Sequence, residues 1–240
     1  MGRRGHARKL ASRLAAQEKA RTKAKTTTKP KPPPREIPQP GTLRVMLARL
    51  ELARGHDGPL RGGVEPRLLL AAFLMREGKA TLLGRSLTAM GTVKSYPHLS
   101  YVDEQALVLG LPRRSEPGAV TLLCLVLEED SGRDIETLFG DLAAPTRFVG
   151  YDGHTDVPAP VTLAAMMARP STQAPHAEPI QLLRDGRPLE DTLRHDDWIA
   201  ASVIRLENAQ VSTSTRWSVE ARSHDRRNDW TLWLQIGVEV

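Results

Sequence analysis

The run Asp152-Gly153-His154-Thr155-Asp156 holds the residue types of a reactive site. On an extended segment alternate side chains point the same way, so Asp152, His154 and Asp156 would share one face. Two carboxylates beside an imidazole suit a metal centre, or a general base oriented by an acid. A turn rich in hydrogen-bonding residues accounts for the same run, and no second histidine lies close to it in the sequence. We favour the turn.

Other signatures of chemistry are weak or absent. His56-Asp57 and His195-Asp196-Asp197 are weaker candidates than the first run. The sequence has no glycine-rich phosphate loop after a strand, no nucleophile elbow and no paired-cysteine zinc motif. These features favour a protein that is not an enzyme, with an enzyme as the least favoured alternative.

The single cysteine bears on the cellular compartment. Cys124 lies inside the apolar run Leu122 to Leu127, so we expect a buried, reduced thiol with no intramolecular disulfide. No stretch approaches the ~18 to 20 uninterrupted apolar residues of a membrane span. We therefore expect a cytoplasmic protein, either free or peripheral to a membrane.

Charge divides the chain into two unlike parts. The net charge is +6, but residues 1–36 hold 12 of the 34 basic and 2 of the 28 acidic residues, which gives +10 there and −4 in the remainder. The basic character therefore belongs to the N-terminal segment alone. We expect any binding to nucleic acid or to an anionic membrane to depend on residues 1–36, because the remainder would repel phosphate.

Two segments precede the main domain. Residues 1–25 form a basic tail, in which residues 7–25 have the spacing of a marginal amphipathic helix that stays disordered until it is bound. Residues 26–40 form an extended linker rich in threonine and proline. The tail residues expected to bind an anionic surface are Arg3, Arg4, Arg8, Lys9, Arg13, Lys19, Arg21, Lys23 and Lys25.

Three interpretations of this tail remain open. Its cations suit nucleic acid, through release of counterions, or an anionic membrane, where each contributes about 1 kcal/mol. The third interpretation is a solvated arm without a dedicated partner. No aromatic residue precedes Phe73, so the tail lacks the stacking groups of a single-strand binder and the anchors of a strong membrane binder.

Residues 41–240 have the pattern of an antiparallel β-sandwich or barrel. Leu43, Val45 and Leu47 alternate with Arg44, Met46 and Ala48, which indicates a half-buried strand. A helix over Leu68 to Met75 is an alternative to a strand, because leucine and alanine are frequent there. The further strands are expected at Pro66 to Arg76, Thr81 to Met90, Glu104 to Leu111 and Ala119 to Leu127, with a hairpin break at Glu77-Gly78-Lys79.

The C-terminal part continues this pattern. Strands are expected at Ile180 to Leu183, followed by a turn at Arg184 to Arg187, and at Trp198 to Leu206. Val211 to Ser223 and Trp230 to Val240 predict a β-hairpin around the polar turn His224 to Asp229. Its three tryptophans, Trp217, Trp230 and Trp233, are expected to fill the core or to pair across strands.

Prolines bound an insert at residues 157–179. Within it, Val161 to Ala168 has the length of two helical turns, with Met166 and Met167 as adaptable apolar contacts. The simpler interpretation is a loop helix that covers one end of the sandwich. The alternative is a protrusion through which the two methionines contact a protein partner or lipid.

Taken together, residues 41–142 resemble a C2 domain, the β-sandwich module of many membrane-docking proteins. The resemblance rests on the opening strand Thr42-Leu43-Arg44-Val45, on Glu65-Pro66 where the family usually has Asp-Pro, and on the run Leu122 to Gly140. In that run an apolar strand leads into an acidic loop and then Phe139-Gly140, as in the family. The resemblance implies a C2-like antiparallel sandwich.

Many C2 domains bind calcium through loop carboxylates, and others bind none. Ca²⁺ favours about six to eight oxygen ligands, so clustered carboxylates would suit it. The sequence departs from the family in using glutamate at two matching places and in its longer first loop, so a solvated acidic loop is the favoured interpretation. The calcium ligands that the resemblance implies are Asp57 and Glu65 from the first loop, and Glu128, Asp130 and Asp134 or Glu136 from the other.

These observations predict a non-enzymatic binding or scaffold module. Its basic tail would tether it to an anionic membrane surface or to nucleic acid, and its domain would engage a protein partner or self-assemble. The alternative is a capsid-like or nucleic-acid-packaging structural protein, in which a basic arm ahead of a β-sandwich condenses a genome. No cofactor is expected beyond the calcium considered above.

Overall fold

The computed structural model describes residues 41–55, 63–111, 119–151, 161–167, 176–194, 196–206, 214–223 and 226–239. The tail and linker, the pair His56-Asp57, and the run from Asp152 to Asp156 lie outside these residues. The expectations that concern them stay predictions.

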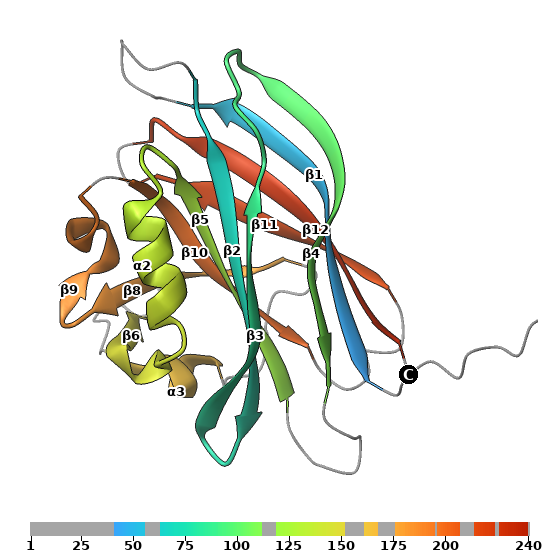
Figure 1. Ribbon diagram of the computed structural model, residues 1–240, viewed down its shortest axis with the longest axis vertical. Helices are drawn as coiled ribbons and strands as arrows, with labels where there is room; N and C mark the ends of the chain where they lie inside the picture. The colour runs from blue at the N-terminus through green and yellow to red at the C-terminus, as the bar shows by residue number, and fades with distance from the viewer. Residues whose placement is uncertain are drawn as a thin grey trace, which may run out of the picture. The chain divides into compact units, whose positions relative to one another are not determined.

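The described residues form two antiparallel sheets (Figure 1). The first sheet has four strands, in the order β11 (Thr215–Arg222), β12 (Asp229–Glu239), β1 (Thr42–Arg54) and β4 (His98–Gly110). The second sheet is curled and has eight strands, in the order β3 (Lys79–Ala89), β2 (Pro66–Arg76), β5 (Ala119–Glu128), β10 (Asp197–Leu206), β8 (Glu178–Arg184), β6 (Phe148–Tyr151) and β7 (Val161–Thr162), with β9 (Arg187–Pro188) paired to β8. The prediction of a mainly β, antiparallel fold is confirmed.

Side chains of the first sheet are apolar on the face that meets the second sheet. Leu43, Val45 and Leu47 of β1 are fully buried and alternate with more exposed neighbours, as the sequence predicts. The predicted hairpin of β11 and β12 is also confirmed, with Trp217 and Trp230 buried in it. These residues form the inner core between the two sheets.

Strands β2 and β5 are buried on both faces. Leu70 and Cys124 belong to the inner core, whereas Leu69 and Leu125 belong to a second, outer core on the other face of the same sheet. Two-sided burial explains why these strands read as continuous apolar runs rather than as alternating ones. The helix considered for Leu68 to Met75 is wrong, because this segment pairs with β3 and β5 along its length.

Two helices cover the outer core, α2 (Arg133–Asp141) and α3 (Leu163–Met167). Figure 1 shows α2 lying against the second sheet. Ile135 and Leu138 are three residues apart on one stripe of α2 and are buried. The acidic loop expected between β5 and Gly140 is therefore shorter than predicted, and Phe139-Gly140 lie in a helix. Two short 3-10 turns, Pro145–Arg147 and Leu189–Thr192, complete this layer.

Two tight hairpins have the backbone that their sequences favour. Glu77 and Gly78 have φ of 47° and 73° between β2 and β3, and Asp185 and Gly186 have φ of 50° and 79° between β8 and β9. Positive φ at both central residues is the signature of the turn that matches the right-handed twist of paired strands. Both turns lie where the sequence placed them.

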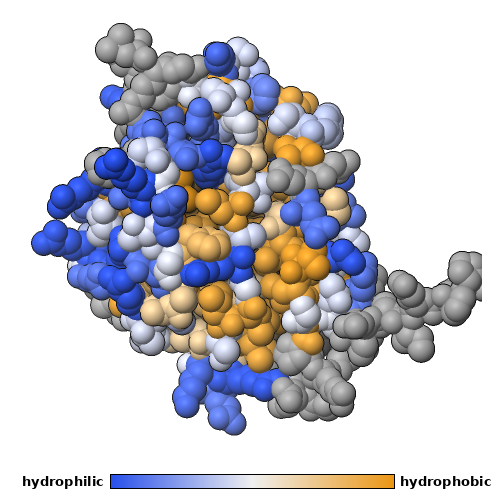
Figure 2. Space-filling model, viewed as in Figure 1, coloured by the Kyte–Doolittle hydropathy of each residue, from blue (hydrophilic) through white to orange (hydrophobic). Residues whose placement is uncertain are grey.

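Strands β3 and β4, at the edges of the two sheets, carry exposed apolar side chains. Figure 2 shows apolar residues gathered over these strands, beside a hydrophilic surface over α2 and β9. Gly84 of β3 lies so close to β4 that an added Cβ would be 3.2 Å from Leu109. The outer face of β4 exposes Leu99, Tyr101 and Val108.

Replacing Leu70 by alanine is expected to lower the free energy of unfolding by about 2–5 kcal/mol, because the fully buried side chain leaves a cavity in the inner core. The matched control is Leu87→Ala on β3, whose side chain is 42 % exposed and whose loss should cost less than about 1 kcal/mol. Chemical denaturation measures both variants. Equal losses would contradict the burial described for β2.

Candidate functional site

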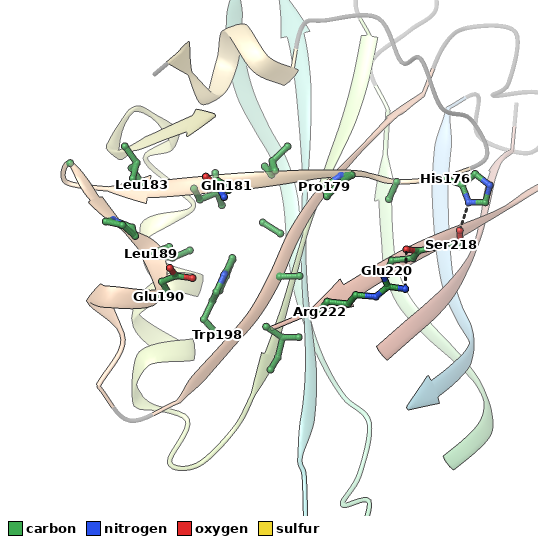
Figure 3. Close-up of a pocket in the computed structure, with 18 residues that line it drawn as sticks. His176, Pro179, Gln181, Leu183, Leu189, Glu190, Trp198, Ser218, Glu220 and Arg222 are labelled. Carbon is green, nitrogen blue, oxygen red and sulfur yellow. Dashed lines mark hydrogen bonds and ion pairs between the residues drawn. The ribbon is translucent and has the colours of Figure 1, made fainter. Parts of the chain in front are cut away.

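Strand β8 changes its pairing partner halfway along its length. Glu178, Pro179 and Ile180 pair with β10, whereas Gln181–Arg184 pair with β6. Within the described residues, no strand pairs with β10 at Trp198–Ala200 on the side that faces β8. A groove opens between the two strands where they part (Figure 3).

The edge strand β11 borders the other side of this groove (Figure 3). Ser218 on β11 is joined to the residues before β8, because the backbone N–H of Ala177 donates to the Ser218 carbonyl oxygen at 2.9 Å. Beyond Ser218, the segment 219–222 has β12 as its only strand partner in the described part of the chain. The groove therefore lies between backbone edges of two different sheets.

The groove has the size and lining of a ligand site. Its volume is 880 Å³, within the range of about 300–1,000 Å³ that is usual for such sites. Ile180, Leu183 and the half-buried Trp198 supply apolar surface. Figure 3 shows Glu190 on the side of Trp198, and Glu220 and Arg222 on the side of β11. A mixed lining of this kind suits a ligand that is apolar along part of its length and polar at defined points.

His176 and Ser218 form the one contact at the groove that invites a catalytic interpretation. The His176 Nδ1 atom lies 2.7 Å from the Ser218 Oγ atom. A nucleophilic serine needs its base to be oriented by a third group, and no carboxylate among the described residues hydrogen-bonds to this ring. Ser218 is also buried. The pair is best explained as a structural contact that fixes the segment before β8 to the edge of β11.

A buried carboxylate organises the acidic loop that follows β5. Asp196 is 3 % exposed. Its Oδ1 atom accepts hydrogen bonds from the backbone N–H groups of Asp130, Ser131 and Gly132, at 2.9, 2.8 and 2.9 Å. Its Oδ2 atom accepts two more from Asp134 and Ile135, in the first turn of α2, at 2.9 and 3.2 Å. The backbone of this loop thus converges on a negative charge supplied by the protein itself.

The same hydrogen bonds set the charge state of Asp196. Burial, the strongest single influence, would raise the pKa of this carboxyl, but the backbone hydrogen bonds together outweigh it. The pKa of Asp196 is consequently lower than its ordinary value of 3.8, and the group is ionised at neutral pH.

The predicted calcium ligands do not converge within the described residues. The Asp134 carboxylate accepts hydrogen bonds from the backbone of Arg194 and Asp196 at 2.7 and 3.2 Å, and the Glu65 carboxylate accepts one from Thr92 at 3.0 Å. Glu128 is buried. In the described part of the chain, no three acidic, histidine or cysteine side chains are placed to hold a metal ion. Asp57 lies outside that part, so calcium binding stays a prediction.

Met166 and Met167 are 2 % and 1 % exposed and pack in the outer core. The Met166 carbonyl oxygen accepts a hydrogen bond from the buried Arg205 guanidinium at 2.7 Å, and the Met167 carbonyl oxygen accepts one from the Thr121 hydroxyl at 3.1 Å. Arg205 also pairs with Glu178 at the start of β8. The described helix of the insert, Leu163–Met167, thus covers the outer core, as in the simpler interpretation. A partner could reach the two methionines only if α3 left the core.

Cys124 is fully buried in the inner core and has no disulfide partner. Burial raises the pKa of its thiol to about 12. The thiol is therefore protonated at neutral pH and, being inaccessible, does not act as a nucleophile.

No family model, curated protein or solved structure matches this chain. Among the described residues, no helix has the length and apolar character needed to span a membrane. The interpretation of the site therefore rests on its own geometry.

Sequence reasoning did not identify the groove. Its lining comes from segments around residues 180, 200 and 220, which strand pairing rather than sequence spacing brings together. One signal was present: Pro179 cannot donate a ladder hydrogen bond, and proline in a strand marks an edge or a break in pairing. In the structure Pro179 lies one residue before the place where β8 leaves β10.

Replacing Asp196 by asparagine is expected to destabilise the fold by at least about 2 kcal/mol, because the amide loses the charge that five backbone N–H groups solvate and turns an N–H₂ group toward some of them. Chemical denaturation measures the loss. Asp191→Asn removes the same charge at an exposed position nearby and should change stability by less than about 0.5 kcal/mol.

The contribution of Asp196 should also depend on pH. Because the folded pKa is depressed, the stabilisation is complete above the unfolded pKa and is lost as the pH falls through the lower, folded pKa. Wild type and Asp196→Asn should therefore differ most at neutral pH and converge in acid. A difference that does not shrink anywhere in the acid range would contradict the assigned charge.

Proposed function

We propose that this protein is a non-enzymatic binding module whose groove takes an extended polypeptide segment from a protein partner. The observation that carries the proposal is the pair of strand edges, 198–200 of β10 and 219–222 of β11, that face the groove without another described strand on them. An extended peptide can pair with such an edge and gain main-chain hydrogen bonds.

The lining favours a peptide over a compact small molecule. Apolar surface from Trp198 and Ile180 lies between polar groups at both ends of the groove, so side chains at alternate positions of a strand would meet different surroundings. In this mode the backbone supplies affinity and the side-chain contacts supply selectivity. We therefore expect the partner to present a short, extended segment that includes an apolar residue.

The basic tail supplies the second half of the proposal. Residues 1–36, which comprise the tail and most of the linker, carry +10 and the remainder −4, so this N-terminal segment is the part with long-range attraction to an anionic surface. We propose that it tethers the domain to an anionic membrane surface or to nucleic acid in the cytoplasm, while the groove engages the protein partner. A C2-like sandwich, with calcium at the loops that follow β1 and β5, is the form of this proposal that the sequence resemblance suggests.

A second candidate function is self-assembly, as in a capsid-like or nucleic-acid-packaging protein. It is favoured by the outer face of β4, where Leu99 and Tyr101 are 48 % and 76 % exposed. Replacing Tyr101 by arginine should shift an assembled protein to smaller species in size-exclusion chromatography with light scattering, because a charge would replace a large apolar contact. A wild-type protein that is already monomeric at all concentrations would remove this candidate.

The groove can be tested by selecting random linear peptides, displayed on phage, against the full-length chain. Selected peptides should bind the Trp198→Ala variant at least about tenfold more weakly, because the ring supplies the largest apolar surface of the groove. Trp233→Ala is the matched control, since it removes a partly exposed tryptophan from the first sheet instead. Peptides that bind both variants equally, or that protect the outer face of β4 from hydrogen exchange, would contradict the proposal that the groove is the peptide-binding site.

The tail can be tested in the full-length chain by replacing its nine predicted anion-binding residues with glutamine. Wild type should bind phosphatidylserine vesicles or duplex DNA at low salt and release them as salt rises, whereas the variant should bind neither. Glutamine at four exposed domain arginines, Arg133, Arg187, Arg194 and Arg216, is the control. Binding that survives neutralisation of the tail would refute its role, and the preferred probe separates membrane from nucleic acid.

A further inference from the structure

A second cavity lies at the end of β11, and three arginines line it. Its volume is 420 Å³, and Arg54, Arg222 and Arg226 surround it with Ser223, Asn228 and Asp229. Arg222 also lines the groove. Arg222, the last residue of β11, therefore lines both cavities.

Among the described residues, positive charge is in excess in this arginine pocket. The Asp229 carboxylate pairs with two of the guanidinium groups, at 3.1 Å from Arg222 and 3.4 Å from Arg54. Arg222 lies 3.8 Å from Glu220 as well. Within the described residues, the Arg226 guanidinium has no ion-pair or hydrogen-bond partner. Two of the three arginines, Arg54 and Arg222, thus share two carboxylates, and the Arg222–Glu220 pair is at the long end of the ion-pair range.

The backbone at Arg226 points to a role for its side chain. Its φ is 60°, a conformation that glycine adopts freely and arginine rarely does. Hydrogen bonds within the turn fix the backbone there: Arg226 N–H donates to the Ser223 carbonyl oxygen at 2.9 Å, and Asn228 N–H donates to the Ser223 hydroxyl at 3.0 Å. The turn holds an arginine at the rim of the pocket in a position that its backbone alone would assign to glycine.

We propose that the arginine pocket binds an oxyanion, a carboxylate or phosphate group, carried by the peptide that lies in the groove. The identity of the carrier rests on the proposed function, but the anion site itself does not. Arginine presents a planar fork of N–H groups that matches both oxyanions, often through two hydrogen bonds at once. A strand paired with residues 219–222 of β11 would run past Arg222 and bring an acidic side chain, a phosphorylated residue or its own C-terminal carboxylate to the pocket.

This site changes the expectation that anions bind only through residues 1–36. The remainder of the chain has a net charge of −4, yet its arginines are not spread evenly over the surface. A net charge governs long-range attraction, whereas a pocket binds through the few groups that line it. Local convergence of guanidinium groups therefore permits anion binding by a domain that is acidic as a whole.

Inorganic phosphate is the probe for the anion site in the full-length chain. Added at constant ionic strength, it should shift the NMR signals of the arginine Nε–H groups of Arg54, Arg222 and Arg226. Arg226→Gly should weaken this response at least about fivefold, as expected for loss of a charge-assisted hydrogen bond, while the melting temperature stays the same or rises because glycine suits the backbone. Arg216→Gln, at an exposed position of β11 away from the arginine pocket lining, is the control and should leave the response unchanged.

Two outcomes of this titration would overturn the site: a phosphate response that is unchanged in Arg226→Gly, or one confined to arginines of the tail. Arg54→Gln provides a second variant should Arg226→Gly alter the turn, and it should weaken phosphate binding too. Its partner Asp229 retains Arg222 as a hydrogen-bond donor, so the turn should stay folded.

The peptide carrier is tested separately, with groove-binding peptides made with and without their acidic residue. Wild type should prefer the acidic form, and Arg226→Gly should weaken that preference about as much as it weakens phosphate binding, while keeping its sensitivity to Trp198→Ala. Equal binding of both forms by wild type would overturn the carrier while leaving the groove in place. Failure to obtain any peptide that depends on Trp198 would instead remove the proposed function, and the phosphate titration would still decide the anion site.

Discussion

Two neighbouring strands of the second sheet, β2 and β5, are apolar on both faces and must be kept from water on both, and most of the architecture follows from that requirement. The first sheet shields one face with the alternate apolar residues of β1, β11 and β12. The other face needs a second layer, which comes from α2, α3 and the strands around β6. At about 25 cal/mol per Å² of apolar surface, leaving either face open would cost more than the net stability of a typical domain.

The helices that cover the outer core have backbone N–H and C=O groups at their ends that need hydrogen-bond partners. Buried charged side chains supply some of these partners. The Asp196 carboxylate accepts hydrogen bonds from the backbone N–H groups of the loop and of the first turn of α2. The Arg205 guanidinium donates to the Met166 carbonyl oxygen near the end of α3 and pairs with Glu178. Each helix that covers the outer core is thus fixed at one end by a charged side chain from β10 or from the residue before it. The groove follows from the same arrangement, because β8 leaves β10 to join the β6 layer.

Local patterns in the sequence predicted the elements but not the layers. Alternation in β1 and β12 and the hairpin turns at Gly78 and Gly186 are properties of neighbouring residues, so they could be read directly. The continuous apolar run of β2 left a helix as an alternative to the expected strand, because such a run has no period. The role of Asp196 was hidden for another reason. Its partners lie more than 60 residues away in the sequence, and they are backbone groups, which no residue type reveals.

Pairing of β1 with β12 sets the order in which this domain can be completed during synthesis. The backbone N–H of Gly41 donates to the carbonyl oxygen of Glu239, and the ladder between the two strands runs along nearly their whole length. Strand β1 therefore lacks this partner until β12 has been synthesised, and until then the first sheet is incomplete over the inner face of β2 and β5. Contacts of such long sequence separation slow folding, and nascent chains with exposed strand edges are prone to aggregate. During this interval a chaperone, or a binding partner present during translation, would protect the exposed strand edges from aggregation.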